Sequence, residues 1–342
     1  MTHLRVENRD NSIRALRNEL ELKYLALPIY NRPVALIDLP THLNIGDSLI
    51  ALGQFNLLGS KLDYRYIGGI PSEDILKQID GEKGAIIFHG GGNFGTLWPS
   101  HQRLRERIAT ECPNATLIQL PQSTFFDSKD ALEKSISILE SHGDFHVLVR
   151  DQASYETLAQ RNLASITLCP DSAFALEAKP NGSPAHDILF VTRSDHESDH
   201  SSTLSSLRMN FAKSRASQVD WANWEELGNG SWRKYRFIDR LFPRLLRVFR
   251  APAFSRLLWT GLFQSRLRLG VDLLSSGKVI VTDRLHVHIL CRLIGKPHIF
   301  FDNNYGKISN LSDTWNTQSE ISISSRTISD PVETIERLLR TP

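Results

Sequence analysis

Short apolar runs that each end in a polar or glycine-rich cluster constrain the fold of this chain most. In its first half these runs lie at residues 34–38, 85–88, 116–120 and 146–149, and amphipathic stretches separate them. Runs this short, alternating with helical stretches, are typical of a parallel sheet covered by helices on both faces. The first half therefore predicts a doubly wound α/β sheet.

A second series of such runs follows a predicted linker. Residues 179–184 read KPNGSP, a turn-rich hexapeptide, and apolar runs follow at 188–192, 279–282 and 298–301. At 342 residues the chain is also too long for one ordinary core. We therefore expect an α/β fold with two Rossmann-like doubly wound domains facing a cleft, over residues 1–180 and 185–342.

A helix is predicted to lead the first domain, over residues 11–26. Its apolar residues recur at helical spacing on or near one side, namely Ile13, Leu16, Leu20 and Leu22.

Residues 198–268 fit the alternating pattern poorly and are expected to form a basic insertion in the second domain. Residues 233–268 carry ten Lys/Arg and one acid, Asp239. Their apolar stripe (Phe237, Leu241, Leu245, Val248) runs beside a stripe of arginines, which indicates either a solvated cationic helix or a peripheral contact with an anionic membrane. Pro243 lies inside the stripe and argues against one continuous helix.

Net charge, the length of the apolar runs and the cysteine spacing exclude several classes of protein. The formal net charge of +2 gives no indication of nucleic-acid binding, and we expect no nucleic-acid partner. The N-terminus lacks a signal-peptide pattern and no apolar run approaches the roughly 18 residues of a spanning helix, so a cytoplasmic location is predicted. Cys112, Cys169 and Cys291 are too widely spaced to indicate a metal site or a disulfide framework.

Two polar clusters in the first half lie where predicted strands end, which is where doubly wound sheets bind ligands. Gly91, Gly92 and Asn93 follow one strand, and their backbone N–H groups indicate either an anion site or a tight turn. His89 just before them is a candidate proton donor or a structural residue. Asp47, in the motif Asn-Ile-Gly-Asp, is either a helix N-cap or a base for a sugar hydroxyl.

Two clusters in the second half carry cations. Arg193 opens Arg-Ser-Asp-His-Glu directly after a strand, and its planar fork suits a carboxylate or phosphate, although this segment, which includes Glu197, is also compatible with a surface loop. Arg284 and His286 follow a strand and open an apolar helix, where a helix N-terminus already favours an anion. Lys307 lies beyond the next strand.

These motifs, in this order, resemble the polysaccharide pyruvyl transferase family, particularly its bacterial exopolysaccharide-operon branch. The resemblance covers roughly residues 30–310. It rests on 44–47 (NIGD), 90–95 (GGGNFG), 120–123 (LPQS), Arg150 with 153–155 (ASY), 170–171 (PD), Arg193 with 195–197 (DHE), 220–221 (DW), 284–286 (RLH) with 288–290 (HIL), and 302–307 (DNNYGK).

The resemblance implies a GT-B-like arrangement and transfer of pyruvate, as a ketal, from phosphoenolpyruvate to a hydroxyl pair of an exopolysaccharide or its lipid-linked precursor. It implies that the second domain binds the donor through Arg193, Arg284, Leu285, His286 and Lys307. The first domain would then bind the acceptor near His89, Gly91, Gly92 and Asn93. His286 is expected to protonate the donor, and Asp47 or Glu197 to act as base. The reaction needs no cofactor and no metal, and it would take place in the cytoplasm or at the inner face of the membrane.

Two alternatives remain open from the sequence. One is a GT-B glycosyltransferase that uses a nucleotide sugar, and the other is a non-catalytic protein of saccharide assembly.

Overall fold

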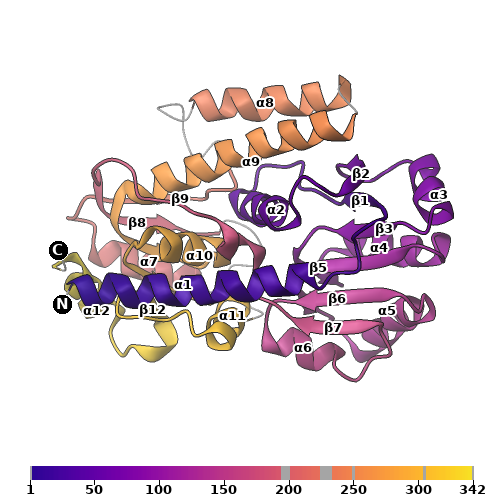
Figure 1. The fold of residues 1–342 in the computed structure, drawn as a ribbon. Coiled ribbons are helices and arrows are strands. Elements are labelled where there is room, and N and C mark those ends of the chain that lie inside the picture. The colour runs from indigo at the N-terminus through magenta and orange to yellow at the C-terminus, as the bar shows by residue number, and fades with distance from the viewer. Residues whose placement is uncertain (1, 194–200, 224–232, 249–250, 303–305, 341–342) are drawn as a thin grey trace.

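Two separate parallel sheets organise the chain, and helices flank both (Figure 1). The computed structural model describes residues 2–193, 201–223, 233–248, 251–302 and 306–340. The first sheet contains β1 (Pro33–Ile37), β2 (Asp63–Ile67), β3 (Ala85–Phe88), β4 (Gly91–Gly95), β5 (Thr116–Phe125), β6 (Phe145–Val149) and β7 (Ser165–Leu168). The second contains β8 (His186–Val191), β9 (Ala216–Val219), β10 (Gly277–Thr282), β11 (His298–Phe300) and β12 (Ser322–Ser324). The prediction of two Rossmann-like parallel sheets is confirmed.

Both sheets share one strand order. The first runs β2-β1-β3-β5-β6-β7, with β4 also pairing with β5, and the second runs β9-β8-β10-β11-β12. In each, the chain places its second strand on one side of the first and its third on the other. This reversal creates a crevice beyond the carboxyl ends of the first and third strands, a usual ligand position in doubly wound folds.

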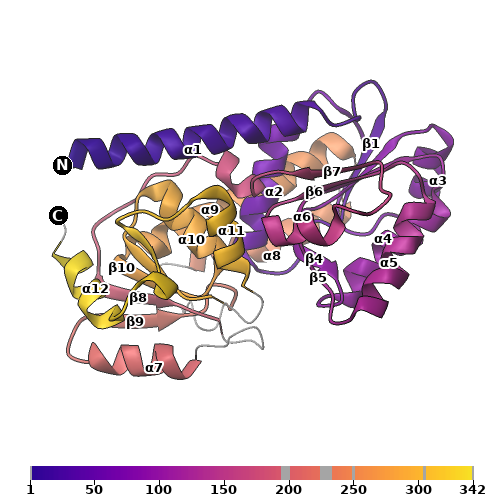
Figure 2. The same ribbon diagram turned by 90° about the horizontal axis from the view of Figure 1, so that it is seen from below.

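Helices connect the strands and cover both faces of the sheets (Figure 2). In the first half these are α1 (Thr2–Leu25), α2 (Ile45–Leu58), α3 (Glu73–Gly81), α4 (Pro99–Glu111), α5 (Lys129–Ser141), α6 (Gln152–Leu158) and the 3-10 turn η1 (Ser172–Ala175). In the second half they are α7 (Ser201–Asn210), α8 (Arg233–Val248), α9 (Pro252–Ser275), α10 (Leu285–Ile294), α11 (Lys307–Trp315), the 3-10 turn η2 (Ser325–Thr327) and α12 (Pro331–Leu339). None of the described helices is both long and apolar enough to cross a membrane.

One apolar core joins the two sheets. Leu36 of β1 and Leu189 of β8 belong to the same buried cluster, which also contains apolar residues of α1, α2, α9 and α10. Side chains of alternate strand residues, such as Ile37 and Ile188, point to the opposite faces and form two smaller cores. Because both faces of each sheet are buried at its centre, the central strands appear in the sequence as continuous apolar runs.

The leading helix α1 runs along both parts of the molecule, as both ribbon views show (Figures 1 and 2). Arg17 Nε donates to the carbonyl of Phe174 at 3.1 Å, and Arg292 of α10 donates to Ser12 Oγ at 2.8 Å. Ile13 and Leu20 are buried as predicted, but Leu22 is exposed. The buried positions continue at Tyr24 instead, four residues after Leu20, which is one helical turn.

Three expectations for irregular segments need correction. Residues 198–268 are not simply an insertion, because β9 lies within them and forms an edge of the second sheet; its sequence ASQV lacks an apolar run. α8 continues through Pro243. Residues 91–95 form the strand β4 rather than a tight turn.

Candidate active site

The crevices of the two sheets meet in one pocket. Asp38 and His89 follow β1 and β3, and Arg193 and Arg284 follow the equivalent strands β8 and β10. All four line a pocket of about 760 Å³. The similar strand order of the two sheets thus brings polar clusters from distant parts of the sequence into one cavity.

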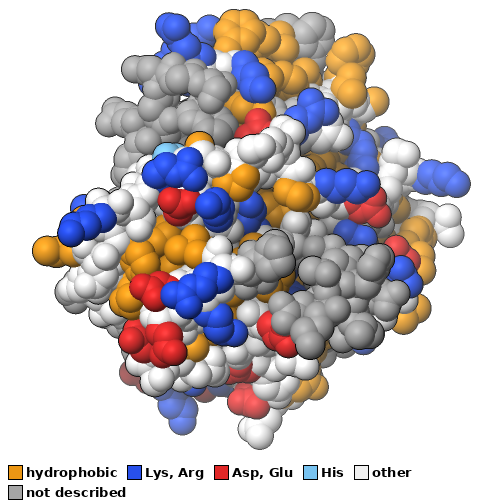
Figure 3. Space-filling view, turned by 90° about the vertical axis from the view of Figure 1, so that its left-hand side faces the viewer, with side chains coloured by type: hydrophobic (Ala, Val, Ile, Leu, Met, Phe, Trp, Pro, Cys, Tyr) orange, Lys and Arg blue, Asp and Glu red, His pale blue; other side chains and the backbone are white. Residues whose placement is uncertain are grey.

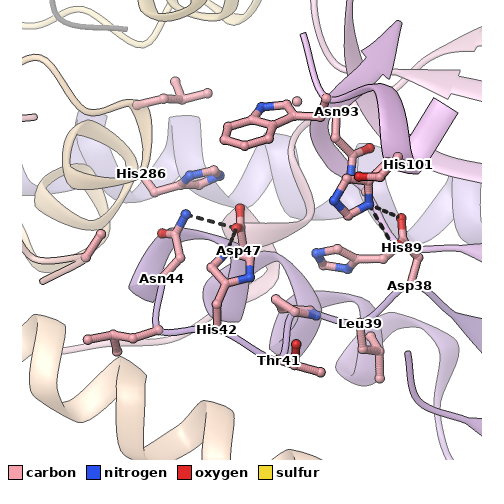
Figure 4. Close-up of a pocket in the computed structure, with 18 of the residues that line it drawn as sticks. Asp38, Leu39, Thr41, His42, Asn44, Asp47, His89, Asn93, His101 and His286 are labelled. Atoms are coloured by element: carbon pink, nitrogen blue, oxygen red, sulfur yellow. Dashed lines mark hydrogen bonds and ion pairs between the residues drawn. The ribbon is translucent and has the colours of Figure 1, made fainter. Parts of the chain in front are cut away.

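The pocket has a first-sheet side and a second-sheet side. Residues 38–44 and the region around 89–93 and 98–101 line the first, together with Asp47 and Arg150. The second consists of Arg193, Trp221, Ala222, Arg284, Leu285, His286 and Lys307. Figure 4 shows His286 approaching Asn44 and Asp47 from one side, and His89 and His101 lying close together on the other.

Arg284 is the N-cap residue of α10 and is held by an acidic partner. Its Nη2 donates to both carboxylate oxygens of Asp220, one of them at 2.6 Å, and both side chains are almost fully buried. Its Nε has no hydrogen-bond partner within the described part of the chain. The guanidinium is therefore fixed in orientation and retains donor capacity for a ligand.

His286 occupies the first turn of α10 and packs against the start of α2. A Cβ on Gly46 would lie 2.5 Å from His286 Nδ1, so only glycine allows the imidazole to come this close. His286 Nε2 lies 3.4 Å from Asp171 Oδ2. Burial opposes ionisation of Asp171, but the adjacent His286 and the charge of Arg150 hold the pKa of its carboxyl well below the ordinary value.

Arg150 is a site residue to which the sequence motifs had assigned no role. Its side chain is 2% exposed, its Nη1 donates to Asp171 at 2.7 Å and its Nε donates to Ser123 at 2.9 Å. Its Nη2 and the Lys307 ammonium both lie next to Gly92, where an added Cβ would be 3.1 Å from the first and 3.5 Å from the second. Asp171 thus links a first-sheet arginine to His286 of the second half.

Asp47 lies in the first turn of α2 but is not its N-cap. Asn44 holds that position, and its side chain accepts from the Gly46 N–H at 2.9 Å. Asp47 accepts from Asn44 Nδ2 at 2.9 Å and lies 3.3 Å from His42 Nε2. Burial opposes its ionisation, but the hydrogen bond and charge of His42 outweigh this and lower the pKa of Asp47, so the carboxylate is a weak proton acceptor.

A histidine–carboxylate pair on the first-sheet side had no signal in the sequence. His101 Nδ1 lies 2.8 and 2.9 Å from the two carboxylate oxygens of Asp38. Because a carboxylate only accepts, Nδ1 carries a proton, and in the neutral imidazole Nε2 is the acceptor. The two residues are 63 positions apart and no local motif joins them.

His89 is buried behind this pair. Its Nδ1 donates to Gln54 Oε1 at 2.8 Å, and burial lowers its pKa to about 4. The imidazole is therefore neutral near pH 7, and its Nε2 is available to accept a hydrogen bond rather than to donate one.

Comparison with known proteins identifies the family. The sequence model described as "Polysaccharide pyruvyl transferase" matches residues 44–305, most of the chain. The chain belongs to the polysaccharide pyruvyl transferase family.

Individual pyruvyl transferases are similar over most of their length. The chain is 31% identical over 304 residues to "Pyruvyl transferase 1" of Schizosaccharomyces pombe, covering 83% of this chain and 70% of that protein. It is 30% identical over 287 residues to "Putative pyruvyl transferase EpsO" of Bacillus subtilis, covering 81% of this chain and 84% of that one. The fold resembles a crystal structure of a functionally uncharacterized Klebsiella pneumoniae protein, with a TM-score of 0.52, 20% identity, and coverage of 87% of this chain and 93% of that one.

Most of the predicted site residues of this pyruvyl transferase family member line the pocket. They are Asp47, His89, Gly92, Asn93, Arg193, Arg284, Leu285, His286 and Lys307. Gly91 lies in β4 and is not one of the lining residues, and the Asn93 N–H is engaged by Gln122 Oε1 at 3.1 Å. Glu197 lies outside the described residues.

Buried histidines should make stability depend on pH. Burial lowers the pKa of His89 and His298 to about 4, and that of His288 well below its ordinary value. Below about pH 6.5 the unfolded chain binds protons that the folded protein does not, so the free energy of unfolding falls as pH decreases toward 4. We expect a loss of roughly 2 kcal/mol for each of His89 and His298 between pH 7 and 4.5, measured by urea denaturation. A constant unfolding free energy over this range would contradict the assignment.

Proposed function

We propose that the protein transfers a pyruvyl group from phosphoenolpyruvate to two hydroxyls of a sugar and forms a cyclic ketal. The observation that carries the proposal is the convergence of Arg150, Arg193, Arg284 and Lys307 on one pocket beside His286. Phosphoenolpyruvate carries about three negative charges near neutral pH on two compact groups. Several arginine forks and an ammonium match this ligand better than they match a neutral sugar.

The start of α10 supplies the second part of the donor site. Arg284 caps the helix and Leu285 and His286 form its first turn. The first N–H groups of a helix have no partner within the helix and attract anions. In the proposal they bind the donor together with Arg284, which Asp220 orients.

In the chemical step, His286 donates a proton to the methylene carbon of the enol. C2 becomes an oxocarbenium-like electrophile, and the first sugar hydroxyl attacks it while a base takes the hydroxyl proton. The C2–O bond to phosphate then breaks, the second hydroxyl attacks C2, and its proton leaves. Ketal and inorganic phosphate are the products, and the balance requires neither a cofactor nor an oxidant.

His101 is the base that the geometry favours for the acceptor hydroxyls. Asp38 binds its Nδ1, so Nε2 can take a proton, and the resulting imidazolium has a carboxylate next to it. Asp47 suits the role less well because its pKa is lowered. Trp98, on the same side of the pocket, offers an indole for the face of a sugar ring.

The acceptor in this proposal is an exopolysaccharide repeat or its lipid-linked precursor, and the reaction takes place on the cytoplasmic side of the membrane, where phosphoenolpyruvate is produced. The similar proteins from Schizosaccharomyces pombe and Bacillus subtilis both have names that contain the words pyruvyl transferase, and this supports the pyruvyl part of the proposal.

Thermal stabilisation by candidate donors tests the proposal. A donor present at 100 times its Kd should stabilise the folded protein by about 2.7 kcal/mol. We expect phosphoenolpyruvate to do so and nucleotide sugars not to. With an acceptor present, phosphate release should accompany the mass gain of a pyruvate ketal on the sugar. Stabilisation by a nucleotide sugar alone would indicate a glycosyltransferase, and no stabilisation by either would indicate a non-catalytic protein.

A further inference from the structure

Helices α8 and α9 pack antiparallel through a small set of inward contacts. Asp239 of α8 accepts from Arg266 Nε of α9 at 2.7 Å, and Tyr235 donates to Asp272. Phe242 packs on Gly261, where an added Cβ would lie 2.8 Å from the ring. These inward positions of α8 are three or four residues apart and define one face of the helix.

The opposite face of α8 is exposed and combines cations with a large apolar side chain. Arg233, Lys234, Arg240 and Arg244 are exposed, and Phe237 between them is 67% exposed. The only acid of α8, Asp239, is turned inward to Arg266 and does not neutralise this face.

The first turns of α9 extend the exposed apolar surface. Leu257 is 67% exposed and Phe254 53% exposed. We call this surface, formed by the outer side of α8 and the N-terminal turns of α9, the hairpin face. α8 forms one outer edge of the molecule (Figure 1), and in Figure 3 cationic and hydrophobic side chains gather at that same upper edge.

The charge of this region differs from that of the rest of the chain. Residues 233–268 hold ten of the 40 basic residues and one of the 38 acidic residues, so the remainder of the chain is net acidic. An anionic surface would orient a protein with this charge distribution, because the surface attracts the basic hairpin face and repels the net acidic remainder of the molecule.

We propose that the hairpin face docks on an anionic lipid surface. In this arrangement Phe237 and Leu257 enter the boundary between headgroups and acyl chains, and Arg233, Arg240 and Arg244 contact the lipid phosphates. A helix that lies in a membrane interface presents both cationic and apolar side chains to the lipid. Binding to a soluble polyanion, by contrast, requires only the cationic side chains. The proposal does not depend on the reaction that the pocket catalyses.

Helix α9, which carries part of the hairpin face, contacts the rim of the pocket. Arg266, which holds Asp239, also donates to the carbonyl of His42 at 2.9 Å and to Ser48 Oγ at 3.1 Å. Arg256 of α9 donates to the carbonyl of Phe55 in α2 at 2.7 Å. Docking would therefore hold segment 38–44 and α2 in a set orientation to the membrane, whatever reaction the pocket catalyses.

Vesicle co-sedimentation of the full chain tests the proposal. We expect binding to vesicles of phosphatidylcholine mixed with phosphatidylglycerol, weakening as salt increases, and little binding to phosphatidylcholine alone. Replacing both Arg240 and Arg244 by glutamate should weaken binding by at least roughly 30-fold, since each lost cation near the surface contributes roughly fivefold. The double variant Phe237→Ser/Leu257→Ser should weaken it as well.

A matched control uses an exposed apolar pair elsewhere. Leu22 and Leu25 of α1 are 63% and 66% exposed, and Leu22→Ser/Leu25→Ser should leave vesicle binding unchanged. Unchanged thermal unfolding of each variant shows that the fold is intact. Equal binding to both kinds of vesicle, or no binding to either, would overturn the proposal. So would loss of binding in the control, or binding to the mixed vesicles that is insensitive to both hairpin-face variants, since the latter would indicate general attraction between polyions.

Discussion

Replacement of His286 by asparagine is expected to lower kcat by about 10²–10⁴-fold and to leave phosphoenolpyruvate affinity nearly unchanged. Asparagine keeps the backbone N–H groups at the start of α10 and fits beside Gly46, but it cannot protonate the methylene carbon. An interaction that acts only in the transition state affects kcat rather than donor binding. Steady-state phosphate release and donor-induced thermal stabilisation measure the two effects separately.

A histidine outside the pocket serves as the control for this variant. His186 lies in β8 on the second sheet and is not one of the lining residues, so His186→Asn should retain full turnover. Full turnover of His286→Asn would remove His286 from the mechanism. Loss of donor binding without loss of kcat at saturation would instead assign it a binding role only.

Replacement of Arg284 by lysine is expected to weaken phosphoenolpyruvate binding by roughly 10- to 100-fold, the size of a lost charge-assisted hydrogen bond. Lysine keeps the positive charge near Asp220, so that carboxylate is not left buried without a partner. An ammonium, however, cannot hold Asp220 and a donor in two fixed directions as a guanidinium fork does. Arg284→Ala is less informative because it leaves Asp220 unpaired, and it could unfold the protein for that reason alone.

The same helix provides a matched control for the lysine substitution. Arg292 of α10 is buried to the same degree as Arg284 but donates to Ser12 and Ser319 instead of facing the pocket. Arg292→Lys should therefore change the free energy of unfolding without changing the Kd for phosphoenolpyruvate. Equal donor affinity in the Arg284→Lys variant and the wild type would contradict the proposed donor site.

Local sequence patterns were sufficient to predict the strands that are buried in the middle of each sheet. Strands buried on both faces are largely apolar, so β1, β3, β5, β6, β8, β10 and β11 could be recognised from short apolar runs. Edge and irregular strands do not meet this condition: β9 reads ASQV and β4 reads GGNFG, and neither was predicted. Helical propensity predicts a break at Pro243, but α8 continues through this residue. The neighbouring side chain of Phe242 packs against α9 at Gly261, so α8 makes a tertiary contact at the position where a break was expected.

The sequence by itself determined the two parallel sheets and the cations at the start of α10, because strand burial and helix termini depend on neighbouring residues. The tertiary structure decided which distant groups meet. Arg150 reaches His286 through Asp171, and His101 reaches Asp38 across 63 positions. It also decided the state of Asp47, which looked like a helix cap or a base and proved to be a carboxylate paired with His42. Such pairings depend on the reversal of strand order in each sheet and on the packing of the two sheets around shared helices, and neither is encoded in any short segment.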